Sequence, residues 1–329
     1  MKNHIKQISL LLLAIIMLVS GTACSYLFSG SSQEPEDVRF TDLSEGLVPL
    51  THTPAVPIVL MPEASGSRVE SNSKALIDYS NTVDGYVMVK WLTDTTMQLR
   101  VQVTGPSSTT YTYIILPNDT FEVFPLSDGN GSYTVGVFEQ VDGNRYAQAI
   151  SVTFSVTLID EFAPFLRPNQ YVNFNKDSNV VEKAAELVTG WNTVIDKVTA
   201  VYDFVITTLT YDTELASDIS NGIVTSYLPD LDSVLARRKG ICFDYASLMT
   251  AMLRSQGIPT KLVVGYTGDV RHAWINVYSD ETGWIDSVIF FDGNEWTMMD
   301  PTFASASTNS ASLRAFIGDG SNYVMTHLY

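Results

Sequence analysis

Short segments between residues 74 and 160 alternate apolar and polar side chains, which is the period of a β-strand that buries one face. The segments with this alternation are 86–91, 98–103, 111–116, 132–138 and 150–156. Turn-forming runs such as Gly105-Pro106 separate them. The pattern predicts an all-β N-terminal domain over residues 74–160, a small β-sandwich of immunoglobulin-like type.

The period changes after Pro164 and Pro168, where apolar residues begin to recur at helical spacing. One series is Val194, Val198, Val201, Tyr202, Val205 and Leu209, and a second is Tyr245, Leu248, Met249, Met252 and Leu253. Several strand-like segments follow the second series. Residues 161–329 are therefore expected to form a second domain, of the α+β class.

Residues 24–73 are rich in Ser, Glu, Pro and Gly and show no sustained apolar period. This composition predicts a mostly extended tether ahead of the first domain. The apolar stretch 56–60 is an exception, and it could dock as a strand on a later domain.

The N-terminus has the order of a secretory signal peptide over residues 1–23: Lys2 and Lys6, an apolar run, then small residues before Cys24. The apolar run, 8–19, is shorter than the roughly 20 residues that a membrane-spanning helix needs. The Gly-Thr-Ala-Cys ending resembles a bacterial lipoprotein cleavage site, which implies that Cys24 carries a lipid. The protein is then expected outside the cytoplasm, attached to the membrane through that lipid only. An ordinary secretion signal is the alternative, because Gly21 stands where the lipoprotein pattern usually has an aliphatic residue.

Composition narrows the function classes. The 36 acidic and 19 basic residues give a formal charge of -17, which disfavours nucleic acid and acidic lipid surfaces as partners. Two cysteines without a CxxC motif provide neither a disulfide framework nor a cysteine-ligated zinc site. The acidic residues lack the spacing of a calcium loop, so we expect no metal and no cofactor.

Cys242 is the first candidate for chemistry. It follows Gly240 and falls at or just before the start of the second predicted helix, where unpaired backbone N–H groups favour an anion. That environment lowers a thiol pKa and makes the sulfur a nucleophile. Gly240 is expected to permit a tight turn that presents the sulfur in a cleft, and the basic run 237–239 is expected to be solvated.

A thiolate of this kind needs a base, and His272 is the candidate inside the second domain. His4 leaves with the signal peptide, His52 lies in the tether and His327 is the third residue from the end. The segment 272–278 reads as a strand, with Ala273 on its buried face and His272 on the other, pointing away from the core.

Asp300 is the candidate partner of the imidazole. It ends the strand-like segment that begins at Trp296, and this strand is expected to neighbour, or nearly neighbour, the histidine strand. Its carboxylate could then accept the imidazole N–H and fix the tautomer.

Three ordered motifs resemble the transglutaminase core family, in its bacterial transglutaminase-like branch. They are Gly240-x-Cys242-x-Asp244-Tyr245-Ala246, His272-Ala273-Trp274 and Trp296-x-x-x-Asp300-Pro301-Thr302, and the upstream Tyr211-Asp212 is also similar. The resemblance covers about residues 177–302. It implies a papain-like fold with Cys242 as nucleophile, His272 as base and acid, and Asp300 as orienting partner.

Three more residues are candidates for the surroundings of the site. Tyr211 is a candidate oxyanion donor beside the Cys242 N–H, because a developing oxyanion needs two donors. Trp274 and Trp296 are candidates for the walls of the substrate cleft, with a place in the core as the alternative.

These features favour an extracytoplasmic thiol enzyme that acts on amide or peptide bonds of a protein or peptide through an acyl-enzyme. The acyl group could pass to water, as in a cysteine protease or amidase, or to an amine, as in an acyltransferase, and the residues leave this choice open. The alternative is a non-catalytic surface adhesion or scaffold lipoprotein with a degenerate transglutaminase-like core.

Overall fold

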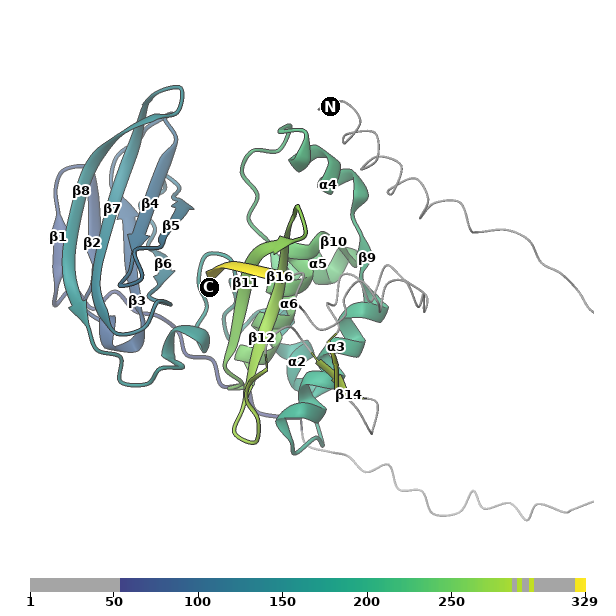
Figure 1. Ribbon diagram of the computed structural model, residues 1–329. Coiled ribbons are helices and arrows are strands. Elements are labelled where there is room, and N and C mark those ends of the chain that lie inside the picture. The colour runs from purple at the N-terminus through teal and green to yellow at the C-terminus, as the bar shows by residue number, and fades with distance from the viewer. Residues whose placement is uncertain (1–53, 286–288, 292–295, 299–322) are drawn as a thin grey trace, which may run out of the picture. The chain divides into compact units, whose positions relative to one another are not determined.

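The computed structural model describes residues 54–285, 289–291, 296–298 and 323–329, and its N-terminal part consists of two four-stranded antiparallel sheets (Figure 1). The first sheet has the order β1-β2-β3-β6, formed by β1 (Val69–Ser71), β2 (Ala75–Asp78), β3 (Tyr86–Trp91) and β6 (Glu122–Pro125). The second has the order β5-β4-β7-β8, formed by β4 (Leu99–Thr104), β5 (Thr110–Ile114), β7 (Gly131–Asp142) and β8 (Arg145–Val156).

Alternating side chains hold the two sheets together. In β4, Leu99, Val101 and Val103 are buried while the residues between them are half-buried. They share one core with Ile77 and Trp91 of the first sheet, so the sheets pack as a sandwich. All five strand segments expected from the alternation are present, as β3, β4, β5, β7 and β8. The immunoglobulin-like type stays a prediction.

Three strands escaped the sequence pattern for a physical reason. All three residues of β1 are exposed, and β2 and β6 each bury consecutive residues. A strand without strict alternation carries no period-two signal. Strand β1 lies within the segment 24–73 that was expected to be a tether.

The C-terminal part is α+β, as expected. Its helices are α2 (Asn179–Leu187), α3 (Val194–Thr208), α4 (Thr213–Ser220), α5 (Leu231–Arg237) and α6 (Cys242–Arg254). An antiparallel sheet of order β13-β12-β11-β16 contains β11 (Thr260–Thr267), β12 (Val270–Ser279), β13 (Gly283–Ile285) and β16 (Tyr323–Leu328). Two short ladders join β9 (Thr210–Tyr211) to β10 (Lys239–Gly240) and β14 (Ile289–Phe291) to β15 (Trp296–Met298).

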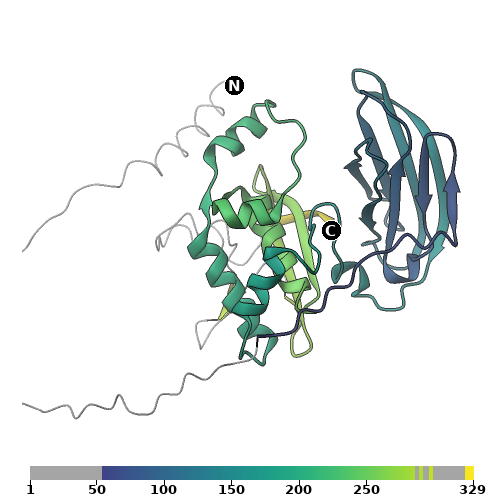
Figure 2. The same cartoon turned by 180° about the vertical axis from the view of Figure 1, so that it is seen from behind.

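Helix α6 is the central element of this part. It contacts β11 and β12 on one side and α2, α3 and α5 on the others, and every residue from Asp244 to Arg254 is buried. The helices lie behind the sheet in Figure 1 and in front of it in Figure 2. At the end of α6, Gly257 adopts φ +73°, and the Ile258 N–H donates to the Leu253 carbonyl. Burial on all sides holds α6 in place, and with it Cys242 at the first position of the helix.

Arg254, at the last position of α6, joins distant segments of the chain. Its buried guanidinium donates to the backbone carbonyls of Thr260 at 2.9 Å, Arg167 at 2.7 Å and Tyr329 at 2.6 Å. The Tyr329 ring in turn packs edge-on against Tyr111 of the sandwich. Burial lowers the pKa of Arg254. The three carbonyl dipoles compensate the charge of the guanidinium. The same hydrogen bonds connect α6 to the end of β16 and to the interdomain segment.

The segment ahead of β1 is bound rather than free. Ile58 donates its N–H to the Ser255 carbonyl at 2.7 Å and forms a parallel bridge with Gln256, so the apolar stretch 56–60 docks on the C-terminal domain. The Gly66 N–H donates to Asp78 at 2.7 Å. Residues 1–53, which include Cys24 and the expected signal peptide, lie outside the described residues. Within the described part, no helix is long and apolar enough to span a membrane.

Candidate active site

Cys242 is the first residue of α6 and carries a free, half-buried thiol. Its position agrees with the expectation that it lies at a helix N-terminus. The N–H groups of the first turn have no partner within the helix and carry the positive end of the helix dipole. A negatively charged sulfur, or an oxyanion held beside it, is favoured at this place.

Asp244 fastens the beginning of α6. The side chain is fully buried, and Oδ2 accepts the N–H of Ile241, the residue just before the helix, at 2.8 Å. Oδ1 accepts the hydroxyl of Tyr227 at 2.6 Å. Burial raises the pKa of Asp244, and the bonds from Tyr227 and Ile241 and the charge of Arg237 oppose that rise. The carboxyl is therefore a structural clamp on the residues next to Cys242.

Gly240 is required for a different reason from the one expected. Its φ is not in the left-handed region, so a tight turn does not demand glycine here. A Cβ atom at this position would lie 2.6 Å from Asp244 Cβ and 2.8 Å from Asp244 Oδ2. Because glycine has no side chain, the Asp244 carboxyl fits beside it. The sequence motif alone did not reveal this requirement.

Tyr211 lies beside the start of α6. Strands β9 and β10 are parallel, with Tyr211 opposite Gly240, and the Asp212 N–H donates to the Gly240 carbonyl at 2.8 Å. Tyr211 is half-buried. Tyr211, 31 positions upstream of Cys242, thus pairs with a residue only two positions before it, and its role as an oxyanion donor stays a prediction.

The basic run 237–239 is bound rather than simply solvated. Arg237 donates from Nε to the Lys239 carbonyl at 2.8 Å and from Nη2 to the Tyr227 hydroxyl at 3.1 Å. Lys239 Nζ lies 3.0 Å from Asp212 Oδ1. These contacts hold β10 from both sides. Sequence reasoning missed the role of Tyr227, because the residue lies outside the three motifs and its loop has no periodic pattern.

His272 lies on β12 opposite Gly265, and its exposed fraction is only 6%. The expectation that it points away from the core was incomplete. Ala273 joins the core that contains α6, but the face of His272 is also covered, by Trp274 and by Tyr323 of β16. Both faces of a central strand are buried here, which an alternating sequence does not show.

Trp274 lines the same face as His272. It is buried, and its ring is edge-on to Tyr323 at 5.1 Å between centroids. A Cβ atom at Gly265 would lie 2.7 Å from the Trp274 ring, so the indole lies across that glycine. Trp274 is therefore a packed wall next to the imidazole.

His327 lies closer to the site than its place near the chain end suggested. It belongs to β16 and pairs with Val264 of β11, in the same sheet as His272. It is half-buried, and burial lowers its pKa. Chain position was a poor guide because β16 returns to pair with β11.

The third motif falls largely outside the described residues. Asp300 is not described, and of Trp296 only the backbone is. Strand β15, which begins at Trp296, pairs with β14, whereas β12 pairs with β11 and β13. The place of the Asp300 carboxylate beside His272 stays a prediction.

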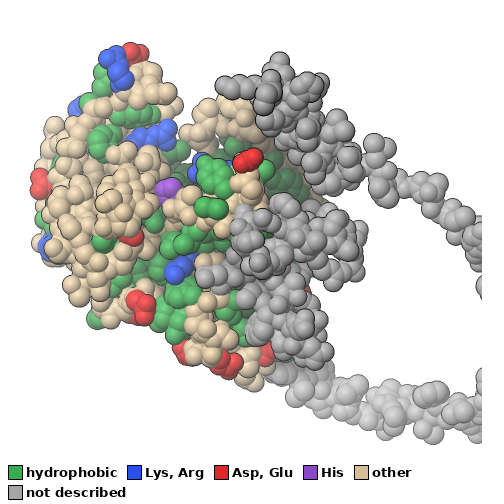
Figure 3. All heavy atoms as spheres, in the orientation of Figure 1, with side chains coloured by type: hydrophobic (Ala, Val, Ile, Leu, Met, Phe, Trp, Pro, Cys, Tyr) green, Lys and Arg blue, Asp and Glu red, His purple; other side chains and the backbone are tan. Residues whose placement is uncertain are grey.

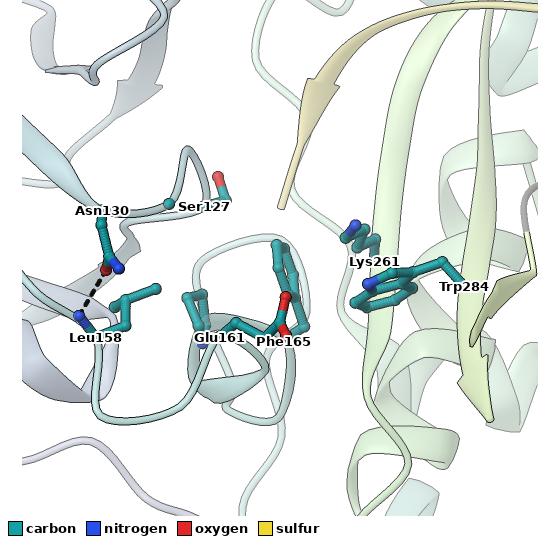
Figure 4. A pocket seen from close by; sticks show the side chains of 9 residues that line it. Ser127, Asn130, Leu158, Glu161, Phe165, Lys261 and Trp284 are labelled. Atoms are coloured by element: carbon teal, nitrogen blue, oxygen red, sulfur yellow. Dashed lines mark hydrogen bonds between the residues drawn. The ribbon is translucent and has the colours of Figure 1, made fainter. Parts of the chain in front are cut away.

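A cleft of about 280 Å³ lies away from these residues (Figure 4). Ser127 and Asn130 of the sandwich, Glu161 and Phe165 of the connecting segment, and Lys261 and Trp284 of the C-terminal sheet help to line it. Lys261 Nζ lies 3.6 Å from the centre of the Trp284 ring, a cation–π contact. Cys242, His272 and Tyr211 are not among the lining residues.

Exposed apolar residues lie at the end of the sheet that carries His272. Tyr266 and Val324 are paired across β11 and β16, Met325 is opposite Gly265, and Val270 begins β12. Figure 3 shows hydrophobic side chains exposed on the described surface of this part, with Lys, Arg, Asp and Glu side chains scattered among them. Among the described residues, no group of three or more His, Cys, Asp or Glu could hold a metal ion.

Comparison with known proteins finds a family match over part of the chain. Residues 181–301 match the model of the transglutaminase-like superfamily. The uncharacterized protein YebA of Bacillus subtilis is 30% identical over 121 residues, which cover 31% of this chain and 16% of that protein. A protein-glutamine gamma-glutamyltransferase of Pseudomonas aeruginosa is 32% identical over 68 residues, 16% of this chain and 10% of that protein. The chain therefore spans less than a fifth of these curated relatives.

Among solved structures, the periplasmic domain of TgpA from Pseudomonas aeruginosa is similar with 16% identity and a TM-score of 0.32, covering 74% of this chain and 77% of that one.

Proposed function

Because residues 181–301 belong to the transglutaminase-like superfamily, we propose that this protein is an extracytoplasmic thiol enzyme acting on amide or peptide bonds of proteins or peptides. The observation that carries the proposal is the position of Cys242. Cys242 begins α6, the central helix of the matched region. Tyr211 pairs with Gly240, two residues before Cys242, in the parallel ladder of β9 and β10.

The proposed reaction has two halves. The thiol proton of Cys242 passes to His272 while Sγ attacks the carbonyl carbon, and the oxyanion accepts the Cys242 N–H and the Tyr211 hydroxyl. The C–N bond breaks, the imidazolium protonates the leaving amine or ammonia, and a thioester remains on Sγ. Water or an amine then attacks the thioester, its proton returns through His272, and the free thiol is restored. Asp300 is assigned to hold the imidazole.

The choice of acceptor follows from competition at the thioester. Hydrolysis is our first assignment, and transfer to an amine is the second, supported by the name of the Pseudomonas aeruginosa relative. The exposed apolar side chains of Val270 and Met325 share the face of the sheet that carries His272, and they suit apolar side chains of a polypeptide substrate. We assign attachment to a lipid on Cys24 and export by residues 1–23, and we regard the sandwich as immunoglobulin-like.

The test uses the alkylation of a single thiol. In a chain carrying Cys24→Ser, only Cys242 remains, and the rate of its reaction with iodoacetamide is followed from pH 5 to 9. We expect rapid reaction well below the free-thiol pKa of about 8.5, and loss of that reactivity in His272→Ala. His327→Ala is the matched control, since His327 lies in the same sheet, and it should keep the reactivity.

Three outcomes contradict the proposal: alkylation that rises only near the free-thiol pKa, no difference between wild type and His272→Ala, or equal loss in His327→Ala. The adhesion or scaffold function would then take its place. If the thiol is activated, glutaminyl peptides with and without an added primary amine identify the acceptor, through free ammonia and through the mass of the product.

A further inference from the structure

The loop between α4 and α5 contains one residue that reaches the start of α6. Most residues before Tyr227 in this loop are exposed, from 221 to 223 and at 225 and 226, whereas Tyr227 is half-buried. Its hydroxyl donates to Asp244 Oδ1 at 2.6 Å and accepts from Arg237 Nη2 at 3.1 Å. A surface loop thus supplies a hydrogen bond to a fully buried carboxylate.

The two carboxylate oxygens of Asp244 accept hydrogen bonds from different donors. Oδ2 accepts the Ile241 N–H, and Ile241 immediately precedes Cys242. Oδ1 accepts the Tyr227 hydroxyl, which compensates for the lost hydration of a buried charge. If the carboxyl becomes neutral, it is a weaker acceptor, and its bond to Ile241 weakens.

We propose that Tyr227 is a positioning residue for Cys242, acting through Asp244 to keep the first turn of α6 in the geometry that the thiol needs. This inference rests on the proposed role of Cys242 as nucleophile. It adds a residue that the sequence motifs do not contain.

The charges around Asp244 fix the direction of the expected effect. Arg237 Nη2 of α5 lies 3.9 Å from Oδ2, and Asp212, which follows β9, raises the pKa of Asp244 through its negative charge while being paired with Lys239. Burial raises that pKa most, and the Tyr227 hydroxyl lowers it. Removing the hydroxyl therefore raises the pKa of Asp244 further, so the carboxyl becomes neutral at a higher pH.

The experiment is the pH profile of Cys242 alkylation in Tyr227→Phe, made in the full chain with Cys24→Ser. We expect the acid limb to move to higher pH by about one unit, because a hydrogen bond to a charged group is worth about that much. At a pH on that limb the rate should fall about tenfold, and above pH 8 the two profiles should meet. Tyr146→Phe, which removes the hydrogen bond from a tyrosine hydroxyl on strand β8 of the sandwich to Gln98 Oε1, is the matched control and should keep the wild-type profile.

A second variant covers the case in which Tyr227→Phe does not fold. Asp244→Asn cannot titrate, so its profile should lack the limb assigned to Asp244 and show a lowered rate on the alkaline side as well. An unshifted limb in folded Tyr227→Phe, or a wild-type profile in Asp244→Asn, overturns the inference. Failure of the proposed function is detected separately, because the Cys242 alkylation profile of His272→Ala would then equal that of the wild type.

Discussion

Replacement of Gly240 by alanine tests whether the clamp at Asp244 controls the nucleophile. The added Cβ would lie 2.6 Å from Asp244 Cβ, whereas carbon atoms in contact prefer about 3.5–4.0 Å. Asp244 is fully buried and cannot swing into solvent, so it must shift by about 1 Å. That shift stretches the 2.8 Å bond from the Ile241 N–H beyond hydrogen-bonding range.

The expected change in the free energy of unfolding follows from the loss of this hydrogen bond between Ile241 and Asp244. A buried hydrogen bond to a charged group contributes about 1.5–3 kcal/mol. Alanine returns about 0.4–1 kcal/mol, because it restricts the unfolded chain more than glycine does. Gly240→Ala should therefore lower the free energy of unfolding by about 1–2 kcal/mol. A displacement of about 1 Å at a nucleophile can cost about 100-fold in rate, so Cys242 should also react much more slowly.

Urea unfolding and the alkylation rate of Cys242 measure the two effects in the same chain. Gly143→Ala is the control, since a Cβ there meets nothing within 4 Å and only the positive φ of +51° is strained. We expect it to cost about 1 kcal/mol of stability and to leave the thiol unchanged. Wild-type stability and reactivity in Gly240→Ala would refute the reasoning, as would an equal loss of reactivity in Gly143→Ala.

Two further predictions concern the elements around the site. With a substrate from the peptide screen, Tyr211→Phe should lower kcat about 100- to 1000-fold with little change in KM, and an unchanged kcat in steady-state kinetics removes Tyr211 from the oxyanion site. Asp230 caps α5 by accepting the N–H and hydroxyl of Ser233, which lower its pKa, so Asp230→Ala should cost about 1 kcal/mol at pH 7 in urea unfolding. This stabilisation is present above the unfolded pKa of about 3.9 and is lost as pH falls through the lower folded value, so a difference that persists at pH 2 contradicts it.

The sequence predicted a helix or strand correctly where its apolar residues recur with a regular period. Alternation identified β3, β4, β5, β7 and β8, and helical spacing identified α3 and α6. The apolar residues of each segment recur with a regular period in the sequence, so the element is visible even where the structure buries nearly every side chain, as in β3 and α6. The exposed β1 and the short β9 and β10 have no such period, and only their hydrogen-bond partners reveal them.

The candidate site shows the same division. The sequence predicted that Cys242 begins a helix, from Gly240 and the helical spacing that follows it. It also predicted that His272 lies on a strand, from the alternation of residues 272–278. The reason for Gly240 was misjudged, because the atom that forbids a side chain there belongs to Asp244, four residues on. His327 was set aside on its chain position, although β16 pairs with β11.

The sequence by itself determined the two classes of domain, the identity of the candidate nucleophile and base, and the helix that carries the thiol. These depend on residue type and on spacing over a few turns, which the order of side chains records directly. Only the tertiary structure decided that Tyr211 lies beside Gly240, that Tyr227 and Arg237 support Asp244, and that both faces of β12 are covered. Such contacts join segments far apart in the chain, and they depend on burial and pairing geometry that no local pattern encodes.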